Sequence, residues 1–277
     1  MDRTVKIAGL QLAPSADGEK NLSKAGELVG LAAGEGARII ALPQLFNTRW
    51  FAHKIDEKNF SLAEKADGPA ISAMREAAAR HKAVIVAAIF EEDNGSFYNT
   101  AFVINVDGAI IGKYRKVHVP MIPLWEERAY FRPGDLGFPV FDTPFGKLGV
   151  QICWDVFFPE GMRMLALKGA ELVVAPTASA FEHSHKKWER AVCASAHANG
   201  LYIMRVNRVG REDKQEFYGR SFCARPDGEF VHKPSGSSTG VVLADIDLGD
   251  VATVRNEWVF LKDRRPGEYK GISEDKA

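Results

Sequence analysis

The sequence predicts an α/β protein in which helices cover mixed β-sheets, and three observations support this fold class. The chain has 277 residues, within the size of one domain, and its hydrophobic content of 46% is enough for a large core. Segments with the two-residue period of strands alternate with segments of helical period in two parts of the chain. A strand hairpin separates the two parts, which makes a sheet mixed. We expect a single domain over residues 1–277, because no linker interrupts it.

The first part of the chain has the order β-α-β-α-β followed by a hairpin. Apolar residues alternate or run together in the strands, and they recur at three- and four-residue spacing in the helices. Asp93-Asn94-Gly95 and Asp107-Gly108 are turn signals that bound the hairpin strands. The predicted elements are strands 5–12, 38–42, 83–90, 97–106 and 109–114, and helices 19–33 and 69–81.

The second part repeats the alternation of strand and helix. Proline near a helix start and glycine just after a helix end are boundary signals, and Pro159 and Gly200 supply them here. The predicted elements are strands 147–153, 172–175, 201–206, 217–224 and 241–247, a helix opening near Pro159, and helices 184–199 and 250–262. A polar tail follows, and we expect residues 265–277 to dock on a partner subunit or to fray.

Composition excludes several classes of function. The 36 basic and 36 acidic residues give a formal charge of zero without a basic block, so no nucleic-acid partner is expected. The longest apolar run, 83–90, is far shorter than the roughly 20 residues of a membrane-spanning helix, and the first residues lack the apolar stretch of a signal peptide. We therefore expect a cytoplasmic protein without membrane contact. Three cysteines, Cys153, Cys193 and Cys223, fit free thiols better than a disulfide framework.

Cys153 is the main candidate for a nucleophile. It stands where the strand 147–153 ends, just before a helix opening near Pro159, and ligands collect at the carboxyl ends of strands in open α/β sheets. A nearby helix N-terminus lowers the pKa of a thiol, so we expect Cys153 to be partly thiolate at neutral pH. The alternative is a structural cysteine, since free cysteine is among the most buried residue types.

Three segments hold candidate companions of this thiol. An ammonium at Lys116 would favour the ionised sulfur and stabilise a tetrahedral oxyanion, unless its basic segment is only a solvated loop. The segment 126–135 is acidic and aromatic, and a carboxylate in it could orient the lysine or simply face water. Gln44 is the polar residue that follows Pro43 at the end of the strand 38–42.

These segments together resemble the carbon–nitrogen hydrolase family, the nitrilase superfamily, whose members use a Glu–Lys–Cys triad. The matching motifs are 114–120 around the lysine, 149–155 around the cysteine and 127–134 around a second glutamate, and the resemblance covers almost the whole chain. It implies that Cys153 is the nucleophile, Lys116 the catalytic lysine and Glu127 the second glutamate. It also implies a four-layer αββα sandwich with mixed sheets that pairs into homodimers or larger homo-oligomers.

Gln44 departs from the family pattern. The family's general base is a glutamate that follows proline at the end of the second strand, and here this position holds glutamine. An amide cannot accept the proton, and the loss of a positioned base typically costs about 10² to 10⁴ in rate. We expect weak or absent turnover, with Glu127 as a partial substitute. Three interpretations stay open: an engineered replacement, a natural variant with altered chemistry, or a binding protein that has lost catalysis.

The resemblance implies a small-molecule amide, ureido or nitrile substrate. The Cys153 thiolate would attack its carbon, while Lys116 and the backbone N–H of Trp154 hold the developing negative charge. The segment 245–269 is most similar to the N-carbamoyl-amine and β-ureidopropionase branches, which favours a ureido or simple amide substrate. The segment 181–188 is a pocket rim or a solvated helix start, and it lacks the acidic pattern expected for a diamine substrate.

No metal or other cofactor is expected. The histidines and cysteines of the chain lack the paired spacing of metal ligands. The chain also has no glycine-rich loop followed by lysine and Ser or Thr, so nucleotide phosphates have no evident site.

Overall fold

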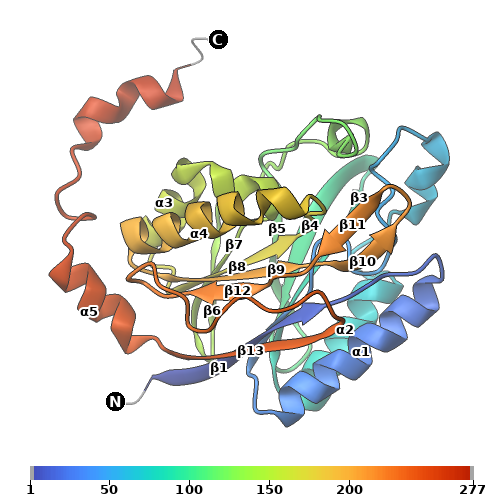
Figure 1. Cartoon of the computed structure of the whole chain (residues 1–277), viewed down its shortest axis with the longest axis horizontal. Helices are drawn as coiled ribbons and strands as arrows, with labels where there is room; N and C mark the ends of the chain where they lie inside the picture. The colour runs from blue at the N-terminus through green and yellow to red at the C-terminus, as the bar shows by residue number, and fades with distance from the viewer. Residues whose placement is uncertain (1–2, 275–277) are drawn as a thin grey trace.

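The computed structural model describes residues 3–274, and it places two β-sheets face to face between two layers of helices (Figure 1). Helices α1 (Gly18–Gly34) and α2 (Pro69–His81) cover the outer face of one sheet, and α3 (Pro159–Leu167) and α4 (His185–Asn199) cover the other. This arrangement confirms the predicted αββα sandwich with mixed sheets.

The first sheet has six strands in the order β13-β1-β2-β3-β4-β5. Strands β1, β2 and β3 are parallel, and β13, β4 and β5 add antiparallel edges. The crossovers from β1 to β2 and from β2 to β3 carry α1 and α2, as the sequence predicts. The six strands are β1 (Thr4–Gln11), β2 (Ile39–Ala41), β3 (Val84–Asp93), β4 (Ser96–Ile104), β5 (Ile110–Arg115) and β13 (Gly240–Asp247).

The second sheet has five strands in the order β12-β9-β8-β7-β6, with β7, β8 and β9 parallel. A separate hairpin, β10 (Val209–Glu212) with β11 (Gln215–Tyr218), stands beside it. The five strands of the sheet are β6 (Val140–Thr143), β7 (Gly146–Val150), β8 (Leu172–Thr177), β9 (Tyr202–Asn207) and β12 (Phe222–Ala224).

Several predicted boundaries were wrong. The strand 217–224 is two strands in different sheets, because the chain turns at Gly219 and Arg220, whose φ angles are +66° and +52°. The last helix, α5 (Gly249–Glu257), ends before 262. Strands β6 and β10 were missed because they are short and carry few apolar residues, and the strand 147–153 ends three residues before the cysteine.

The two sheets pack closely through their apolar inner faces. Gly9 of β1 shows how close they are, because a Cβ at this position would lie 2.6 Å from Cε of Met204 and 2.8 Å from Cγ2 of Val206, both in β9. A residue larger than glycine would push the sheets apart. The parallel strands β2, β7 and β8 therefore hold fixed relative positions, and the loops at their carboxyl ends are anchored to a rigid core.

The chain after α5 first contacts α4, where the rings of Trp258 and Phe260 each lie 5.5 Å from that of His197, and its last part then extends away from the sandwich in Figure 1. Beyond α5 it carries four exposed large apolar side chains and a short 3-10 helix, η5 (Pro266–Ser273). The four side chains are Trp258, Phe260, Tyr269 and Ile272. The predicted tail 265–277 is described as far as residue 274, and residues 275–277 lie outside the described part.

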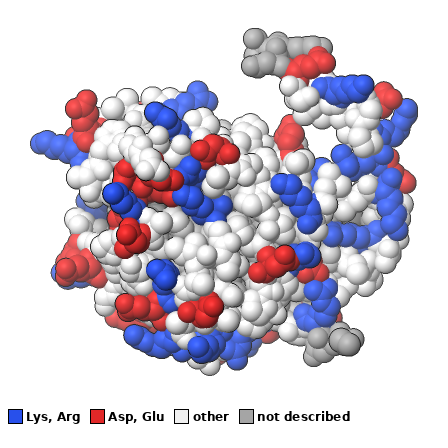
Figure 2. Space-filling view, turned by 180° about the vertical axis from the view of Figure 1, so that it is seen from behind, with Lys and Arg blue, Asp and Glu red and all other residues white. Residues whose placement is uncertain are grey.

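The surface mixes both signs of charge. Figure 2 shows Lys and Arg interspersed with Asp and Glu on the face opposite to that of Figure 1. Within residues 3–274, no helix is both long enough and apolar enough to cross a membrane.

Candidate active site

Cys153 occupies a sharp turn between strand and helix. Strand β7 ends at Val150, and Cys153 begins the short 3-10 helix η3 (Cys153–Phe157). Its φ of +52° lies in the left-handed region, which residues other than glycine rarely adopt. Such strained conformations persist where the surroundings enforce them, and they cluster at functional sites. The turn presents a buried thiol, 3% exposed, at the carboxyl end of the sheet.

Asp155 holds this turn in place. Its fully buried carboxylate accepts hydrogen bonds from the hydroxyl of Tyr114 at 2.7 Å, from the backbone N–H of His118 at 2.9 Å and from that of Ile152 at 2.9 Å. These bonds join β5 and its following loop to the cysteine turn. Sequence reasoning missed this role, although a carboxylate two residues after the predicted apolar strand 147–153 was a visible signal.

Lys116 and Glu127 form a fully buried ion pair. The ammonium Nζ lies 2.6 Å from Oε2 of Glu127, and neither side chain is exposed. Lys116 directly follows β5, and Glu127 begins the 3-10 helix η2 (Glu127–Ala129). Burial raises the pKa of Glu127, whereas the charge of Lys116 and its hydrogen bond oppose this rise. Breaking such a pair would leave an uncompensated buried charge.

Gln44 also contacts the carboxylate of this pair. Its Nε2 donates to Oε2 of Glu127 at 3.4 Å, while its own Oε1 is buried without a partner among the described residues. Asn99 also lowers the pKa of Glu127, although both amide atoms of Asn99 lack a hydrogen-bond partner among the described residues. Among the groups that lower this pKa, Lys116 has the largest effect. Glu127 is thus the carboxylate that contacts both Lys116 and Gln44.

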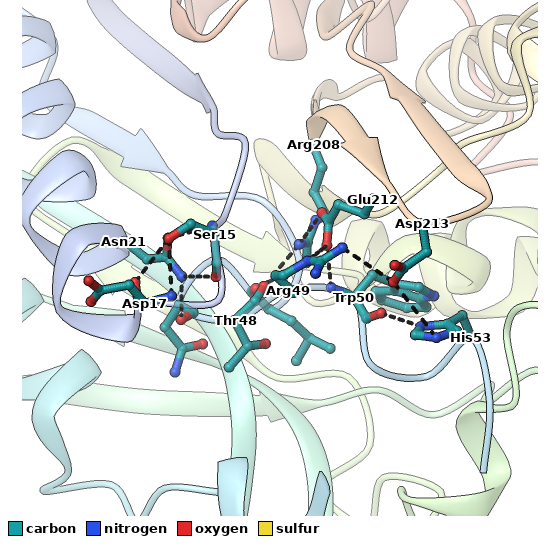
Figure 3. Close-up of polar contacts among 12 residues, drawn as sticks. Ser15, Asp17, Asn21, Thr48, Arg49, Trp50, His53, Arg208, Glu212 and Asp213 are labelled. Atoms are coloured by element: carbon teal, nitrogen blue, oxygen red, sulfur yellow. Dashed lines mark hydrogen bonds and ion pairs between the residues drawn. The ribbon is translucent and has the colours of Figure 1, made fainter. Parts of the chain in front are cut away.

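The loop after β2, which carries Gln44, is held by Arg208 (Figure 3). The buried guanidinium donates to the carbonyl oxygens of Gln44 at 3.3 Å, Leu45 at 3.1 Å and Thr48 at 2.9 Å, and to Oε1 of Glu212 at 2.7 Å. Leu45 has a φ of +52°, so this loop, like the cysteine turn, has a strained residue. Sequence reasoning gave no hint of this contact.

A cavity of about 350 Å³ opens onto the cluster. Cys153, Glu127 and Trp154 line it. Lys116 and Gln44 do not line the cavity, but both bind Glu127, which does. Six of its fifteen described lining residues are Trp or Phe. The aromatic lining residues are Trp125, Trp154, Phe157, Phe158, Phe181 and Trp188.

The segment 181–188 contributes to the cavity. Phe181, His183, Ser184, Lys187 and Trp188 all line it, so the interpretation of this segment as a pocket rim is confirmed, and its two lysines also lie exposed at the start of α4. Lys187 is an exposed residue in the first turn of α4.

The expectation of a partly ionised Cys153 was wrong for this structure. Burial raises the pKa of the thiol above its ordinary value, and the negative charge of Glu127 raises it further. The positive charges of Lys116 and Arg205 act in the opposite direction but do not outweigh burial. Deprotonation of the thiol therefore needs a nearby proton acceptor.

The chemistry available here is that of a thiol, an ammonium and a carboxylate around an apolar cavity. Within residues 3–274, no group of three or more His, Cys, Asp or Glu side chains is placed to hold a metal ion. The arrangement suits covalent acyl transfer, because a nucleophile and a carboxylate line one cavity and a cation is paired with that carboxylate.

Comparison with known proteins agrees with this geometry. The family model for carbon-nitrogen hydrolases matches residues 6–256. The chain belongs to the carbon–nitrogen hydrolase family. It is therefore of the amidase type, with an active-site cysteine, and acts on carbon–nitrogen bonds other than peptide bonds.

Individual relatives cover nearly the full chain. An N-carbamoylputrescine amidase from Solanum lycopersicum is 38% identical, covering 97% of this chain and 95% of its own length. A crystal structure of a carbon-nitrogen hydrolase from Helicobacter pylori is 32% identical, with a TM-score of 0.94 over 98% of this chain and 99% of that one.

A third similar protein is a glutamate-to-glutamine variant of an amidase from Nesterenkonia sp. It is 26% identical, with a TM-score of 0.82 and 96% of both chains covered. Its crystal structure has the acetamide moiety of fluoroacetamide covalently added at the active site cysteine.

Proposed function

We propose that the protein cleaves the C–N bond of a small amide or N-carbamoyl compound through a thioester on Cys153, at a rate lowered by Gln44. The observation that carries this proposal is the buried contact of Lys116 with Glu127, 2.6 Å long, beside a cavity that Glu127 shares with Cys153. The similarity to N-carbamoylputrescine amidase supports a ureido substrate.

Each side chain has a distinct role in the proposed reaction. The sulfur of Cys153 attacks the carbonyl carbon, and its proton passes to the leaving nitrogen, which departs as ammonia or an amine. Lys116 and the backbone N–H of Trp154 stabilise the oxyanion that forms in this step. Water then attacks the thioester, releases the acid and restores the thiol.

Glu127 is the proposed proton acceptor in place of the missing glutamate. Its pKa is raised by burial, which brings a carboxylate closer to neutral pH and makes it a better base. Its Oε2 is already bound by Lys116 and Gln44, which reduces its basicity. Because these two effects on the basicity of Glu127 oppose each other, we expect both acylation and hydrolysis of the thioester to be slow.

The Nesterenkonia variant supports a reactive thiol despite glutamine. We take its exchanged glutamate to correspond to Gln44, and in that protein the cysteine still forms a covalent adduct. The Cys153 thiol should accordingly react with substrates even where turnover is slow.

The decisive experiment is intact-mass spectrometry after the addition of N-carbamoyl-β-alanine, N-carbamoylputrescine or a short aliphatic amide, with ammonia measured in parallel. A mass gain equal to the acyl group, absent in Cys153→Ala, would identify the nucleophile. If neither the unchanged protein nor Gln44→Glu acquires mass or releases ammonia from amides, ureides and nitriles, the protein is a silent ligand-binding member of the fold.

A nitrile substrate is the second candidate. The same acyl-thioester intermediate forms from a nitrile after the thiol adds to give a thioimidate, one water adds to the thioimidate, and ammonia leaves. An adduct from an aliphatic nitrile, with no reaction of amides or ureides, would favour it.

We also propose that residues 1–277 act as one domain that assembles at least into a homodimer. The exposed apolar side chains beyond α5, among them Trp258, Phe260 and Ile272, support a partner subunit at the C-terminal segment. Single subunits carrying this much exposed apolar surface are uncommon.

A further inference from the structure

The charged groups around the cavity are unevenly distributed. Among the described residues that line it, Glu127 is the sole carboxylate, and its charge is paired with that of Lys116. Lys187 is the remaining lining residue with a full charge, and it has no ion pair with any described residue. The cavity therefore has an unpaired cation at its mouth and an apolar wall below it.

Neither of the carboxylates nearest to Lys187 in sequence forms an ion pair with it or lines the cavity. Glu182 lies 3.5 Å from Nδ1 of His185 and does not line the cavity, and Glu189 pairs with Arg220 at 3.0 Å. The first turn of α4, which carries Lys187, contains no acidic residue. The positive end of this helix dipole therefore adds to the charge of the lysine.

A second cation lies behind the cavity wall. Arg205 is 1% exposed, and its guanidinium stacks at 4.7 Å on the ring of Trp188, which lines the cavity. Its hydrogen bonds reach only neutral acceptors, the hydroxyl of Tyr218 at 3.2 Å and the carbonyl oxygens of Arg220 at 3.2 Å and Gly219 at 3.5 Å. Glu189 acts on this charge from a distance, but no described carboxylate forms an ion pair with Arg205, so the guanidinium creates a positive potential around it.

We propose that the cavity selects amides or ureides whose unreactive tail ends in a carboxylate, and that Lys187 is the residue that determines this specificity. The inference rests on the proposed function and specifies, in addition, the charge of the substrate's unreactive tail. It runs against the name of the N-carbamoylputrescine amidase relative, whose named substrate ends in an ammonium group. Here an ammonium tail would meet Lys187 at the mouth and the field of Arg205 at the wall.

Aromatic rings provide the competing possibility. The faces of Trp125, Trp154 and Trp188 could attract a cationic tail through cation–π contacts, typically of modest strength. A test must therefore compare tails of equal length that differ only in charge.

Three ureides make this comparison: N-carbamoyl-4-aminobutyrate, N-carbamoylputrescine and N-carbamoylbutylamine, with tails ending in carboxylate, ammonium and methyl. Their kcat/KM values are measured for the unchanged protein and for Gln44→Glu. The carboxylate should exceed the ammonium by about tenfold or more, the effect of a charge contact in a partly desolvated mouth. Lys187→Gln should raise KM for the carboxylate about fivefold with kcat unchanged, and Lys187→Glu should favour the ammonium.

Lys186→Gln is the matched control, since Lys186 is the exposed neighbour that does not line the cavity. It should leave all three kcat/KM values unchanged. A preference for the ammonium or methyl tail, or a carboxylate-to-ammonium ratio unaffected by Lys187→Gln, would overturn the inference.

A binding readout separates this inference from the proposed function. If no ureide is hydrolysed by either form, the hydrolase proposal fails, and alkylation of Cys153 by iodoacetamide then reports occupancy of the cavity. Glutarate should slow the alkylation more than 1,4-diaminobutane does, and Lys187→Gln should remove the difference. Equal protection by the two ligands in the unchanged protein would overturn the charge selection.

Discussion

Placing a carboxylate at position 44 should accelerate the proposed reaction. Gln44 is fully buried and donates to Oε2 of Glu127 at 3.4 Å. In Gln44→Glu this amide becomes a second carboxylate of nearly the same shape. The exchange therefore tests proton transfer with little change in packing.

The size of the effect follows from the contact. Two carboxylates 3.4 Å apart repel by about 5 kcal/mol at an effective dielectric constant of 20, so the pair would tend to keep one proton at neutral pH. Lys116, at 2.6 Å from Glu127, reduces this repulsion and keeps one carboxylate ionised. A dedicated base for Cys153 then becomes available, and kcat/KM should rise about 10² to 10⁴-fold.

The assay is ammonia release from a ureide or amide that forms an adduct on Cys153, together with the adduct's lifetime by intact mass. Both formation and decay of the adduct should accelerate in Gln44→Glu. Gln215→Glu is the control, because Gln215 is also buried but bonds to the carbonyl of Leu124, away from Glu127. An equal gain in the control, or unchanged rates in Gln44→Glu, would refute the role given to position 44.

Three further predictions concern the thiol, the loop and the tail. Because burial raises the pKa of Cys153, its alkylation by iodoacetamide should keep accelerating through alkaline pH; a rate that is already constant from pH 7 upward would contradict this. Arg208→Met should lower the free energy of unfolding by about 3–5 kcal/mol in urea titrations, because it removes the nearest cation of the buried Glu212 and the donor of three loop carbonyl oxygens; a loss below 1 kcal/mol would show that the loop is stable without these contacts. Deletion of residues 265–277 should shift the protein toward smaller assemblies in light scattering, while an unchanged mass would place the subunit contact elsewhere.

Much of the fold was predictable because local patterns and tertiary structure agree. The strands β1 to β5 and the helices α1, α2 and α4 have clear periodicity and turn signals, and their positions match within a few residues. The errors lie where tertiary contacts decide. The break at Gly219 and Arg220 separates one apolar run into two sheets, and no local pattern distinguishes that from a continuous strand.

The side chains of the candidate site were found in the sequence, but their electrostatic state was not. Motifs that resemble those of the family pointed to Cys153, Lys116 and Glu127. In the fold, Cys153 and Glu127 line one cavity, and Lys116 forms an ion pair with Glu127. Whether a thiol ionises depends on how deeply it is buried, and a strand-end position carries no information about depth. Arg205 and Asp155 were missed for the same reason, because their importance comes from burial and from partners distant in sequence.

The charge of the cluster also explains how glutamine can be favourable at position 44. With Gln44, the ammonium of Lys116 balances the carboxylate of Glu127, whereas Gln44→Glu adds a carboxylate that has no cation of its own. Its pKa would be raised in the folded protein above the unfolded value of about 4.3, so the variant is least penalised at pH 4 and loses stability relative to the unchanged protein as pH rises. Urea titrations should give a deficit of about 2–4 kcal/mol at pH 7 that nearly vanishes at pH 4. A deficit independent of pH would mean that shape, and not charge, distinguishes the two residues.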